Sequence, residues 1–448
     1  MFLEKEGKLI YSYDGETVCS EAWGKDALRV RATKNRSFTG RDWALEAKDA
    51  HAGEVEIFED PSAKGGAFAN MYEGTDTSYG KITNGKLHAV IDSGSVITFY
   101  HEDGRVLLKE HFRRLRDEES MPLNIMGREY SNGVGDNFRI VARFVARKGE
   151  KIFGMGQYQQ HELDLKGCML ELAQRNSQVS VPFYLSSIGY GFLWNNPGVG
   201  QVMFANNGTE WVTESGKEID YLVIAGDTPA EIEENYMTLT GKPPMMPEYG
   251  MGFWQCKLRY WNQEQLLSVA RKYKELGVPL DVIVVDFFHW TKQGEFKFDP
   301  KYWPDVPGMC RELKEMGIQV VVSVWPTVDI YSENFEEMKE KGYLVRTEHG
   351  VPLTMLCGGN EVFFDATNPD ARTYVWEKIK KNYYDQGAKL FWLDVAEPEY
   401  SVYDFKNYRY QLGSVQEVGN IYPKYYLKAF YDGMTAEGDT MPISLIRS

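Results

Sequence analysis

Cysteine is scarce in this sequence, and the cysteines that it has are not grouped. The 5 cysteines lie far apart, and no two of them form a Cys-x-x-Cys pair. An odd number at such spacing indicates neither a disulfide framework nor a zinc site, so we expect buried thiols. His289 has no second histidine at metal-ligand spacing. We therefore predict that the protein holds no metal ion.

Long apolar stretches are also missing. Residues 1–8 lack the apolar core of a signal peptide, and no window offers about 18 uninterrupted apolar residues for a membrane span. The segment 154–156 lacks the spaced glycines of a phosphate loop or a dinucleotide fingerprint. We predict a cytoplasmic protein that has no membrane segment and uses no nucleotide cofactor.

Positive charge is in deficit. The sequence has 50 lysines and arginines against 65 aspartates and glutamates, and its net charge is −15. Such a chain has no electrostatic reason to bind nucleic acid or an anionic membrane. Aromatic residues, in contrast, make up 14% of the chain. A flat apolar ring with a polar edge suits the face of a sugar, although a large core needs aromatic residues too.

The first half of the chain has the pattern of an antiparallel β protein. Short segments with period-2 alternation are separated by turns rich in Gly and Asn. The expected strands include residues 86–91, 95–100 and 138–144. Alternation of this kind indicates sheets that have one solvated face. We predict an N-terminal antiparallel β-sandwich over residues 1–242.

A proline-rich junction at residues 241–247 precedes a different pattern. Continuous apolar strands now alternate with helical segments, which is typical of parallel strands covered on both faces. The expected strands are residues 251–256, 281–285, 319–325, 388–393 and 441–446, with a helix at 262–276. We predict a partial catalytic (β/α)8 TIM barrel over residues 243–448.

Five strands do not close such a barrel. A (β/α)8 barrel needs about 250 residues, whereas roughly 200 residues follow the junction. We therefore expect an incomplete barrel with about five βα units. Its open edge strands would be long, apolar and unprotected, which predicts aggregation or pairing with a second copy of the chain as a homo-oligomer.

An acidic cluster follows the fourth of these strands. In the run 391–400, apolar residues lead to Asp394 and Glu397. Barrel enzymes keep their catalytic groups at the carboxyl ends of the strands. Asp394 is short and held on a strand end, so it suits a catalytic carboxylate, with a loop cap as the alternative. Glu397 can orient Asp394 or bind a sugar hydroxyl, or it can be an ordinary solvated glutamate.

The same run resembles the Trp-x-Asp-x-x-Glu nucleophile signature of glycoside hydrolase family 31, and the resemblance places the family's catalytic aspartate on Asp394. Residues 153–156, 181–187, 189–195 and 364–369 also resemble segments of the family. The resemblance implies a retaining α-glycosidase that forms a covalent glycosyl-aspartate and acts on an oligosaccharide or a small α-glycoside.

Asp286 and Phe288 follow the second strand of the expected barrel. Asp286 can accept a hydrogen bond from a sugar hydroxyl, and it matches the first aspartate of an Asp-x-Asp pair in the family's α-glucosidases. Phe288 replaces the second aspartate. An apolar ring cannot accept a hydrogen bond from a hydroxymethyl group, so the replacement favours xylose and resembles the family's α-xylosidases. Core packing is the alternative for Phe288.

Three further residues complete the predicted substrate site. Trp325, at the end of the third strand, can form a wall of the pocket or pack inside the barrel. Trp392 lies in the nucleophile signature. Arg447 matches an arginine that contacts sugar hydroxyls in the family, although chain ends tend to fray. Trp290 and Lys292 lie on the second βα loop, where they can touch a substrate.

The position of the proton donor shapes the functional hypothesis. The resemblance implies an acid/base aspartate after an Arg-Ser segment, and this chain ends at Arg447-Ser448. We therefore expect a fragment that lacks the donor and hydrolyses unactivated disaccharides poorly. The first hypothesis is an enzyme for terminal α-xylosides. The alternatives are an α-glucosidase of the same family and a non-catalytic remnant that binds carbohydrate.

Overall fold

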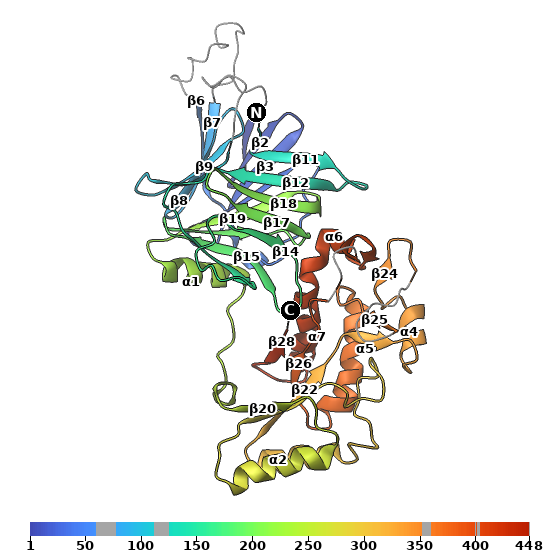
Figure 1. Cartoon of the computed structure of the whole chain (residues 1–448). Coiled ribbons are helices and arrows are strands. Elements are labelled where there is room, and N and C mark those ends of the chain that lie inside the picture. The colour runs from blue at the N-terminus through green and yellow to red at the C-terminus, as the bar shows by residue number, and fades with distance from the viewer. Residues whose placement is uncertain (60–77, 112–124, 352–359, 399, 401–403, 448) are drawn as a thin grey trace. The chain divides into compact units, whose positions relative to one another are not determined.

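The computed structural model describes residues 1–59, 78–111, 125–351, 360–398, 400 and 404–447 (Figure 1). The chain forms two compact units. Unit 1 comprises Met1–Ala173 and Val179–Pro243, and unit 2 comprises Gln174–Gln178 and Pro244–Ser448. The predicted domain bounds, 1–242 and 243–448, stay a prediction.

Unit 1 is built from antiparallel sheets, in line with its period-2 alternation. One sheet has the order β1 (Phe2–Lys5), β2 (Lys8–Tyr13), β3 (Glu16–Trp23), β4 (Ala27–Thr33), β19 (Ile219–Ala225), β16 (Tyr190–Trp194), β15 (Val179–Ser186) and β13 (Ile152–Gln157), with β5 (Ala50–His51) beside β3. A second has the order β10 (Val106–Lys109), β9 (Ile97–His101), β8 (Leu87–Ile91), β7 (Ser78–Asn84) and β6 (Glu54–Glu59). A third has the order β11 (Arg128–Asn132), β12 (Phe138–Phe144), β18 (Thr209–Gly216), β17 (Gly200–Phe204) and β14 (Met169–Leu172) (Figure 1).

The inward-facing side chains of these sheets share one core. Trp211 of β18 stacks on Trp194 of β16, with ring centroids 5.5 Å apart, and Phe99 of β9 meets Tyr221 of β19 edge to face. The strands expected at 86–91, 95–100 and 138–144 are β8, β9 and β12. The prediction of antiparallel sheets is therefore confirmed.

Short helices accompany the sheets of unit 1. They are η1 (Ala47–Asp49), a 3-10 helix, and α1 (Pro229–Thr240). The side chain of Thr228 caps α1 by accepting a hydrogen bond from the backbone N–H of Glu231 (3.2 Å), and Pro229 opens the first turn, where its missing N–H costs nothing.

Unit 2 contains a parallel sheet whose order follows the chain. Its strands are β20 (Trp254–Lys257), β21 (Val282–Val285), β22 (Gln319–Val324), β26 (Leu390–Leu393) and β28 (Ser444–Ile446) (Figure 1). Two small antiparallel pairs join β23 (Thr327–Asp329) to β25 (Glu361–Phe363) and β24 (Arg346–Thr347) to β27 (Tyr408–Arg409). The carboxyl ends of the five parallel strands therefore meet at one edge, where barrel enzymes keep their sites.

Helices separate the parallel strands. The α-helices are α2 (Gln263–Glu275), α3 (Val306–Glu315), α4 (Phe335–Glu340), α5 (Pro369–Ile379), α6 (Val415–Val418) and α7 (Tyr422–Ala436). The 3-10 helices are η2 (Glu248–Met251), η4 (Asp404–Lys406) and η5 (Gly419–Ile421), and η3 (Lys380–Tyr384) is π-helical. Side-chain oxygens of Asn262, Asp305 and Asn368 cap the first turns of α2, α3 and α5, which explains where these helices begin. Among the described residues, no helix is both long and apolar enough to cross a membrane.

The first strand of this sheet differs from its prediction. The sequence favours a buried strand at 251–256, but Met251 ends the 3-10 helix η2 and β20 covers Trp254–Lys257 with half its side chains exposed. Among the described residues β20 pairs with β21 alone, so it forms an edge of the sheet. An edge strand leaves one flank in solvent, which the apolar run 251–256 does not reveal.

Candidate active site

Asp394 directly follows β26 at the carboxyl edge of the parallel sheet. Its backbone N–H donates to the carbonyl of Val324 (3.0 Å), so the pairing with β22 continues past the strand. The residue is 6% exposed, and its Oδ1 accepts a hydrogen bond from the backbone N–H of Val395 (3.0 Å). Val395 has a φ of +57°, a strained value for a β-branched residue, and such strain clusters at functional sites. The backbone thus fixes the orientation of the Asp394 carboxylate.

Arg447 bridges Asp394 and Glu397. Its Nε donates to Oδ1 of Asp394, and its Nη1 lies 3.1 Å from Oε1 of Glu397. Its backbone N–H donates to the carbonyl of Leu393 (3.0 Å), and its carbonyl accepts from the N–H of Ala396 (3.0 Å). The expectation that Arg447 frays is wrong, because these bonds extend the ladder between β26 and β28. One guanidinium therefore compensates two buried carboxylates.

Asp286 follows β21 and lies close enough to Asp394 for their charges to interact. Its Oδ1 accepts a hydrogen bond from the backbone N–H of Phe287 (2.8 Å), and the thiol of Cys256 donates to Oδ2 (3.7 Å). Burial raises the pKa of Asp286, the bond from Phe287 opposes this, and the negative charge of Asp394 raises the pKa again. The structure thus brings together the two carboxylates that were predicted from separate strand ends.

His289 connects the Asp286 backbone to Tyr383. Its Nδ1 lies 3.0 Å from the carbonyl oxygen of Asp286, and its Nε2 lies 2.9 Å from the hydroxyl of Tyr383. Burial lowers the pKa of His289 to about 4, so the ring is neutral at pH 7. With a carbonyl as its partner Nδ1 must donate, and Nε2 then accepts from Tyr383. His289 therefore positions the loop that carries Asp286.

Phe288 is exposed at the same edge of the sheet. The residue is 50% exposed, and its backbone φ is +66°. Its carbonyl accepts a hydrogen bond from Nη1 of Arg259 (3.0 Å), whose guanidinium lies 5.0 Å from the centroid of the Phe288 ring. The alternative that Phe288 packs in the core is wrong, because half of it remains accessible.

A cavity of about 480 Å³ lies beside these residues, entirely within unit 2. The ring of Trp325 lines it and stacks on Phe287 with centroids 5.0 Å apart. Its described lining residues are Arg259, Phe287, Phe288, Trp290, Thr291, Lys292, Gln293, Trp325, Asp329 and Glu361. Aromatic walls with a few polar groups are the usual lining of a small-ligand site.

Trp392 lies elsewhere. It packs against an apolar cluster formed by Val282, Val284 and Val321, and it is not among the described residues that line the cavity. The predicted residues therefore fall into three places. Asp286, Asp394, Glu397 and Arg447 form the carboxylate cluster, Phe288 and Trp325 line the cavity, and Trp392 belongs to the apolar packing.

Sequence reasoning missed Cys256, Tyr383 and Glu361. The thiol of Cys256 contacts Asp286, and the hydroxyl of Tyr383 contacts His289. Glu361 lines the cavity from β25. The pairing of β23 with β25 covers only a few residues, which is too short for a periodic signal. Tyr383 depends on the π-helical turn η3, which no sequence pattern announced.

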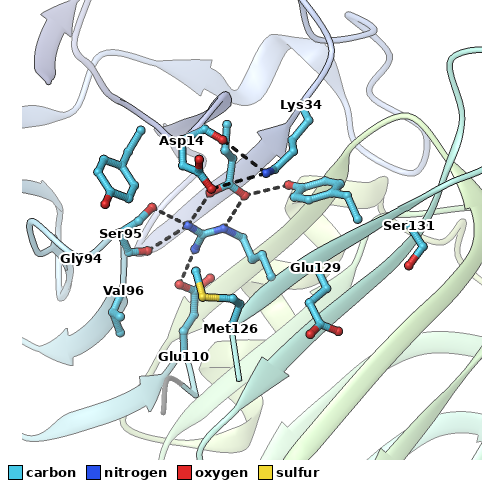
Figure 2. Close-up of a pocket in the computed structure, with 14 residues that line it drawn as sticks. Asp14, Lys34, Gly94, Ser95, Val96, Glu110, Met126, Glu129 and Ser131 are labelled. Atoms are coloured by element: carbon cyan, nitrogen blue, oxygen red, sulfur yellow. Dashed lines mark hydrogen bonds and ion pairs between the residues drawn. The ribbon is translucent and has the colours of Figure 1, made fainter. Parts of the chain in front are cut away.

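A second cavity, of about 470 Å³, lies in unit 1 (Figure 2). Arg128 donates from Nε to Glu16 (2.9 Å) and from Nη2 to Oγ of Ser95 (2.6 Å), and its Nη1 binds Glu110. Figure 2 also shows Lys34, whose side chain extends toward Asp14. The charged groups are thus paired with one another, which indicates a structural ion-pair network.

Within the part of the chain that the structure describes, no group of 3 or more His, Cys, Asp and Glu side chains is placed to hold a metal ion. The carboxylate cluster instead offers three carboxylates, an arginine and an adjoining aromatic cavity. This arrangement can attack an electrophilic carbon and bind polar hydroxyl groups.

Residues 243–448 match a family model described as the TIM-barrel domain of glycosyl hydrolases family 31. The chain is 45% identical to an "Uncharacterized family 31 glucosidase ORF2" of Pseudescherichia vulneris, over 99% of this chain and 83% of that protein. It is 29% identical to alpha-xylosidase A of Aspergillus niger, over 95% of this chain and 60% of that protein.

A solved structure is also similar. It is the crystal structure of a GH31 alpha-xylosidase from a soil metagenome, complexed with xylose. The TM-score is 0.92 at 50% sequence identity, and the match covers 100% of this chain and 65% of the solved chain. The present chain thus spans less than two thirds of this relative and of the Aspergillus niger protein.

Proposed function

The chain belongs to glycoside hydrolase family 31, and from this premise we propose that it acts in a retaining α-glycosidase for terminal α-xylosides. The observation that carries the proposal is the placement of Asp394. It is a buried carboxylate on a strand end, with Arg447 against it and Asp286 beside it. A nucleophile needs a carboxylate that is held in a fixed position.

In the proposed reaction, a carboxylate oxygen of Asp394 forms a bond to the anomeric carbon while the bond from that carbon to the leaving oxygen breaks. The leaving oxygen takes a proton from a general acid. Water then gives a proton to the same group, which is now a base, and attacks the anomeric carbon; the bond to Asp394 breaks, and the sugar is released with retained configuration. The first step uses the free carboxylate of Asp394, and the second step restores it. The guanidinium of Arg447 lies against this carboxylate.

Glu397 is a poor proton donor in this scheme. It follows Asp394 on the same loop, and its carboxyl group lies against Arg447. A general acid must approach from the side of the leaving group. We assign Glu397 the role of holding Arg447, and we assign the proton donor to no described residue.

Phe288 supports a xyloside as the substrate. Its exposed ring offers no acceptor for a hydroxymethyl group, and Asp286, on the same loop, can accept a hydrogen bond from a ring hydroxyl. Two similar proteins are named α-xylosidases, and one of them was solved with xylose. Another similar protein is named a glucosidase, so an α-glucosidase is the second candidate.

Kinetics with two aryl glycosides test the substrate. The protein should prefer p-nitrophenyl α-xyloside to the α-glucoside in kcat/KM by about 10- to 200-fold, the range expected when one group is discriminated. Equal or reversed preference would give the α-glucosidase first place. Specific binding of α-xylosides with no turnover of either substrate would support the non-catalytic alternative.

Four expectations about the architecture, extent, location and assembly of the chain stay predictions. They are the incomplete barrel of about five βα units, the fragment status of the chain, its cytoplasmic location and its pairing with a second copy.

A further inference from the structure

A buried tyrosine lies behind the proposed nucleophile. Tyr426, on α7, is fully buried, and its hydroxyl donates a hydrogen bond to the backbone carbonyl of Val324 (2.9 Å). The same carbonyl accepts a hydrogen bond from the backbone N–H of Asp394 (3.0 Å). Val324 ends β22 and Asp394 directly follows β26, so this carbonyl continues the pairing of the two strands. The side chain of Tyr426 therefore reaches the oxygen atom that holds the backbone of Asp394.

The hydroxyl of Tyr426 acts as a donor at this position. Burial raises the pKa of Tyr426 well above its usual value, and the negative charge of Asp394 raises it further, so the phenol keeps its proton at pH 7. A backbone carbonyl has two lone pairs. The bond from Tyr426 is thus added to the bond from Asp394, and together the two donors restrict the Val324 carbonyl more than one donor can.

Helix α7 is packed against the strand that leads to Asp394 (Figure 1). Phe430, one turn after Tyr426, contacts Phe391 of β26 with ring centroids 5.2 Å apart. The ring of Tyr426 itself meets Phe364 edge to face, with centroids 5.5 Å apart. Because packing holds the ring of Tyr426, its hydroxyl has a defined place behind the sheet edge.

The loop of Asp286 is held in a similar way. There the hydroxyl of Tyr383 donates to Nε2 of His289, and Nδ1 of His289 donates to the backbone carbonyl of Asp286. Tyr383 thus acts on a backbone carbonyl through His289, whereas Tyr426 contacts its carbonyl directly. Each of the two carboxylates from separate strand ends therefore has a buried phenol that supports its backbone.

We propose that Tyr426 is a positioning residue for the nucleophile: its hydroxyl fixes the Val324 carbonyl and, through it, the backbone that aims the carboxylate of Asp394 at the anomeric carbon. The proposal rests on the proposed function, because it takes Asp394 as the group that forms the bond to the sugar. Tyr426 is fully buried, so it acts through Asp394 and not by touching the sugar. Its hydroxyl should therefore affect the rate of bond formation more than the affinity for the sugar.

The kinetics of covalent labelling separate rate from affinity. The reagent 5-fluoro-α-xylosyl fluoride forms the bond to the nucleophile without a proton donor. Labelling at several reagent concentrations gives a rate constant for bond formation and a half-saturating concentration. We expect Tyr426→Phe to lower the rate constant by about 10-fold, because a displacement of about 1 Å can cost roughly 100-fold and the backbone ladder still limits the movement. The half-saturating concentration should stay within about twofold of the wild-type value.

Tyr422→Phe is the matched control. Tyr422 is also fully buried on α7, one turn before Tyr426, and its hydroxyl donates to the backbone carbonyl of Phe364 (2.8 Å). The control therefore removes an equivalent hydrogen bond, but not one to the carbonyl that holds Asp394. It should label at the wild-type rate within about twofold. Thermal unfolding checks that both variants are folded, since each keeps its ring and loses one hydroxyl.

Hydrogen exchange gives a second measurement, which needs no turnover. In Tyr426→Phe the backbone amide of Asp394 should exchange about 5- to 10-fold faster than in the wild type, the effect of one lost hydrogen bond on the opening of this segment. Mass spectrometry of overlapping peptides reads this amide. In Tyr422→Phe its exchange should not change.

The outcomes separate this inference from the proposed function. If Tyr426→Phe labels at the wild-type rate, or if both variants slow labelling equally, Tyr426 does not position Asp394, although labelling of the wild type on Asp394 would still support the proposed function. Unchanged exchange of the Asp394 amide in Tyr426→Phe would overturn the inference as well. If the reagent does not label Asp394 in the wild-type protein, the proposed function fails and this inference fails with it.

Discussion

Arg447 donates a hydrogen bond from Nε to the carboxylate of Asp394, across the ladder that joins β28 to β26. The same guanidinium reaches Glu397 with Nη1. The proposed nucleophile is therefore held by a backbone ladder on one side and by a cation on the other. This relationship gives Arg447 an electrostatic role toward Asp394 in addition to the contact with sugar hydroxyls that the family resemblance implies.

Arg447→Ala should destabilise unit 2. It leaves two buried carboxylates without their cation, and removing one partner of a buried charge pair costs roughly 1–3 kcal/mol or more. Because Arg447 is partly exposed, we expect the substitution to lower the free energy of unfolding, measured with urea, by about 1–3 kcal/mol. Arg447→Lys keeps the charge and should lose less. If the double variant with Asp394→Asn is no more stable than Arg447→Ala, the loss does not come from this charge pair.

The stability of unit 2 should fall in mild acid because of His289. The pKa of histidine is about 6.5 in an unfolded chain, and it is about 4 in the folded protein. The unfolded chain therefore binds the proton first as the pH falls. The contribution of neutral His289 to stability is complete above pH about 6.5 and is lost as the pH falls toward about 4. Over this range the free energy of unfolding should fall by up to about 3 kcal/mol.

Urea midpoints at pH 7 and pH 4.5, compared between the wild type and His289→Gln, measure this contribution. Glutamine keeps a donor for the Asp286 carbonyl and an acceptor for Tyr383, and it does not titrate. The raised pKa of Asp286 acts in the opposite direction, so the comparison between the two proteins isolates the histidine. If the urea midpoint changed equally with pH in both proteins, His289 would not be buried as a neutral ring.

Phe288→Asp should move the preference from α-xylosides toward α-glucosides. The aspartate supplies an acceptor for the hydroxymethyl group, and it tolerates the left-handed backbone at this position better than phenylalanine does. We expect the ratio of the two kcat/KM values to change by about 10- to 200-fold. Phe288→Ala removes the ring without adding an acceptor, so it should lower activity on the xyloside without a matching gain on the glucoside. An unchanged ratio in Phe288→Asp would mean that the ring does not contact the sugar.

The sequence predicted the elements that have a clear period or a cap. β12 appears where the period-2 alternation places it, and α2 lies within the predicted helix 262–276. The apolar runs at β21, β22 and β26 predicted a parallel sheet, because strands buried on both faces carry no polar positions. Asp286 and Asp394 could be found from the strand ends alone.

Features that depend on contacts between distant segments could not be predicted in this way. The pairing of Arg447 with Asp394 follows from the register of β28 on β26, which no local pattern encodes. Glu361 gains its burial from a strand pair of a few residues, and the exposure of β20 depends on its place at a sheet edge. Trp392 fits the family signature, but its packing against Val282 and Val284 is a tertiary property.

Trapping of the covalent intermediate tests the central claim, that Asp394 is the nucleophile. The reagent is 5-fluoro-α-xylosyl fluoride, whose fluoride leaves without a proton donor and whose ring fluorine slows hydrolysis of the glycosyl-enzyme. Mass spectrometry of the digested protein should find one fluoroxylosyl group on Asp394, and Asp394→Asn should carry none. Labelling of another carboxylate, or equal labelling of Asp394→Asn, would contradict the assignment.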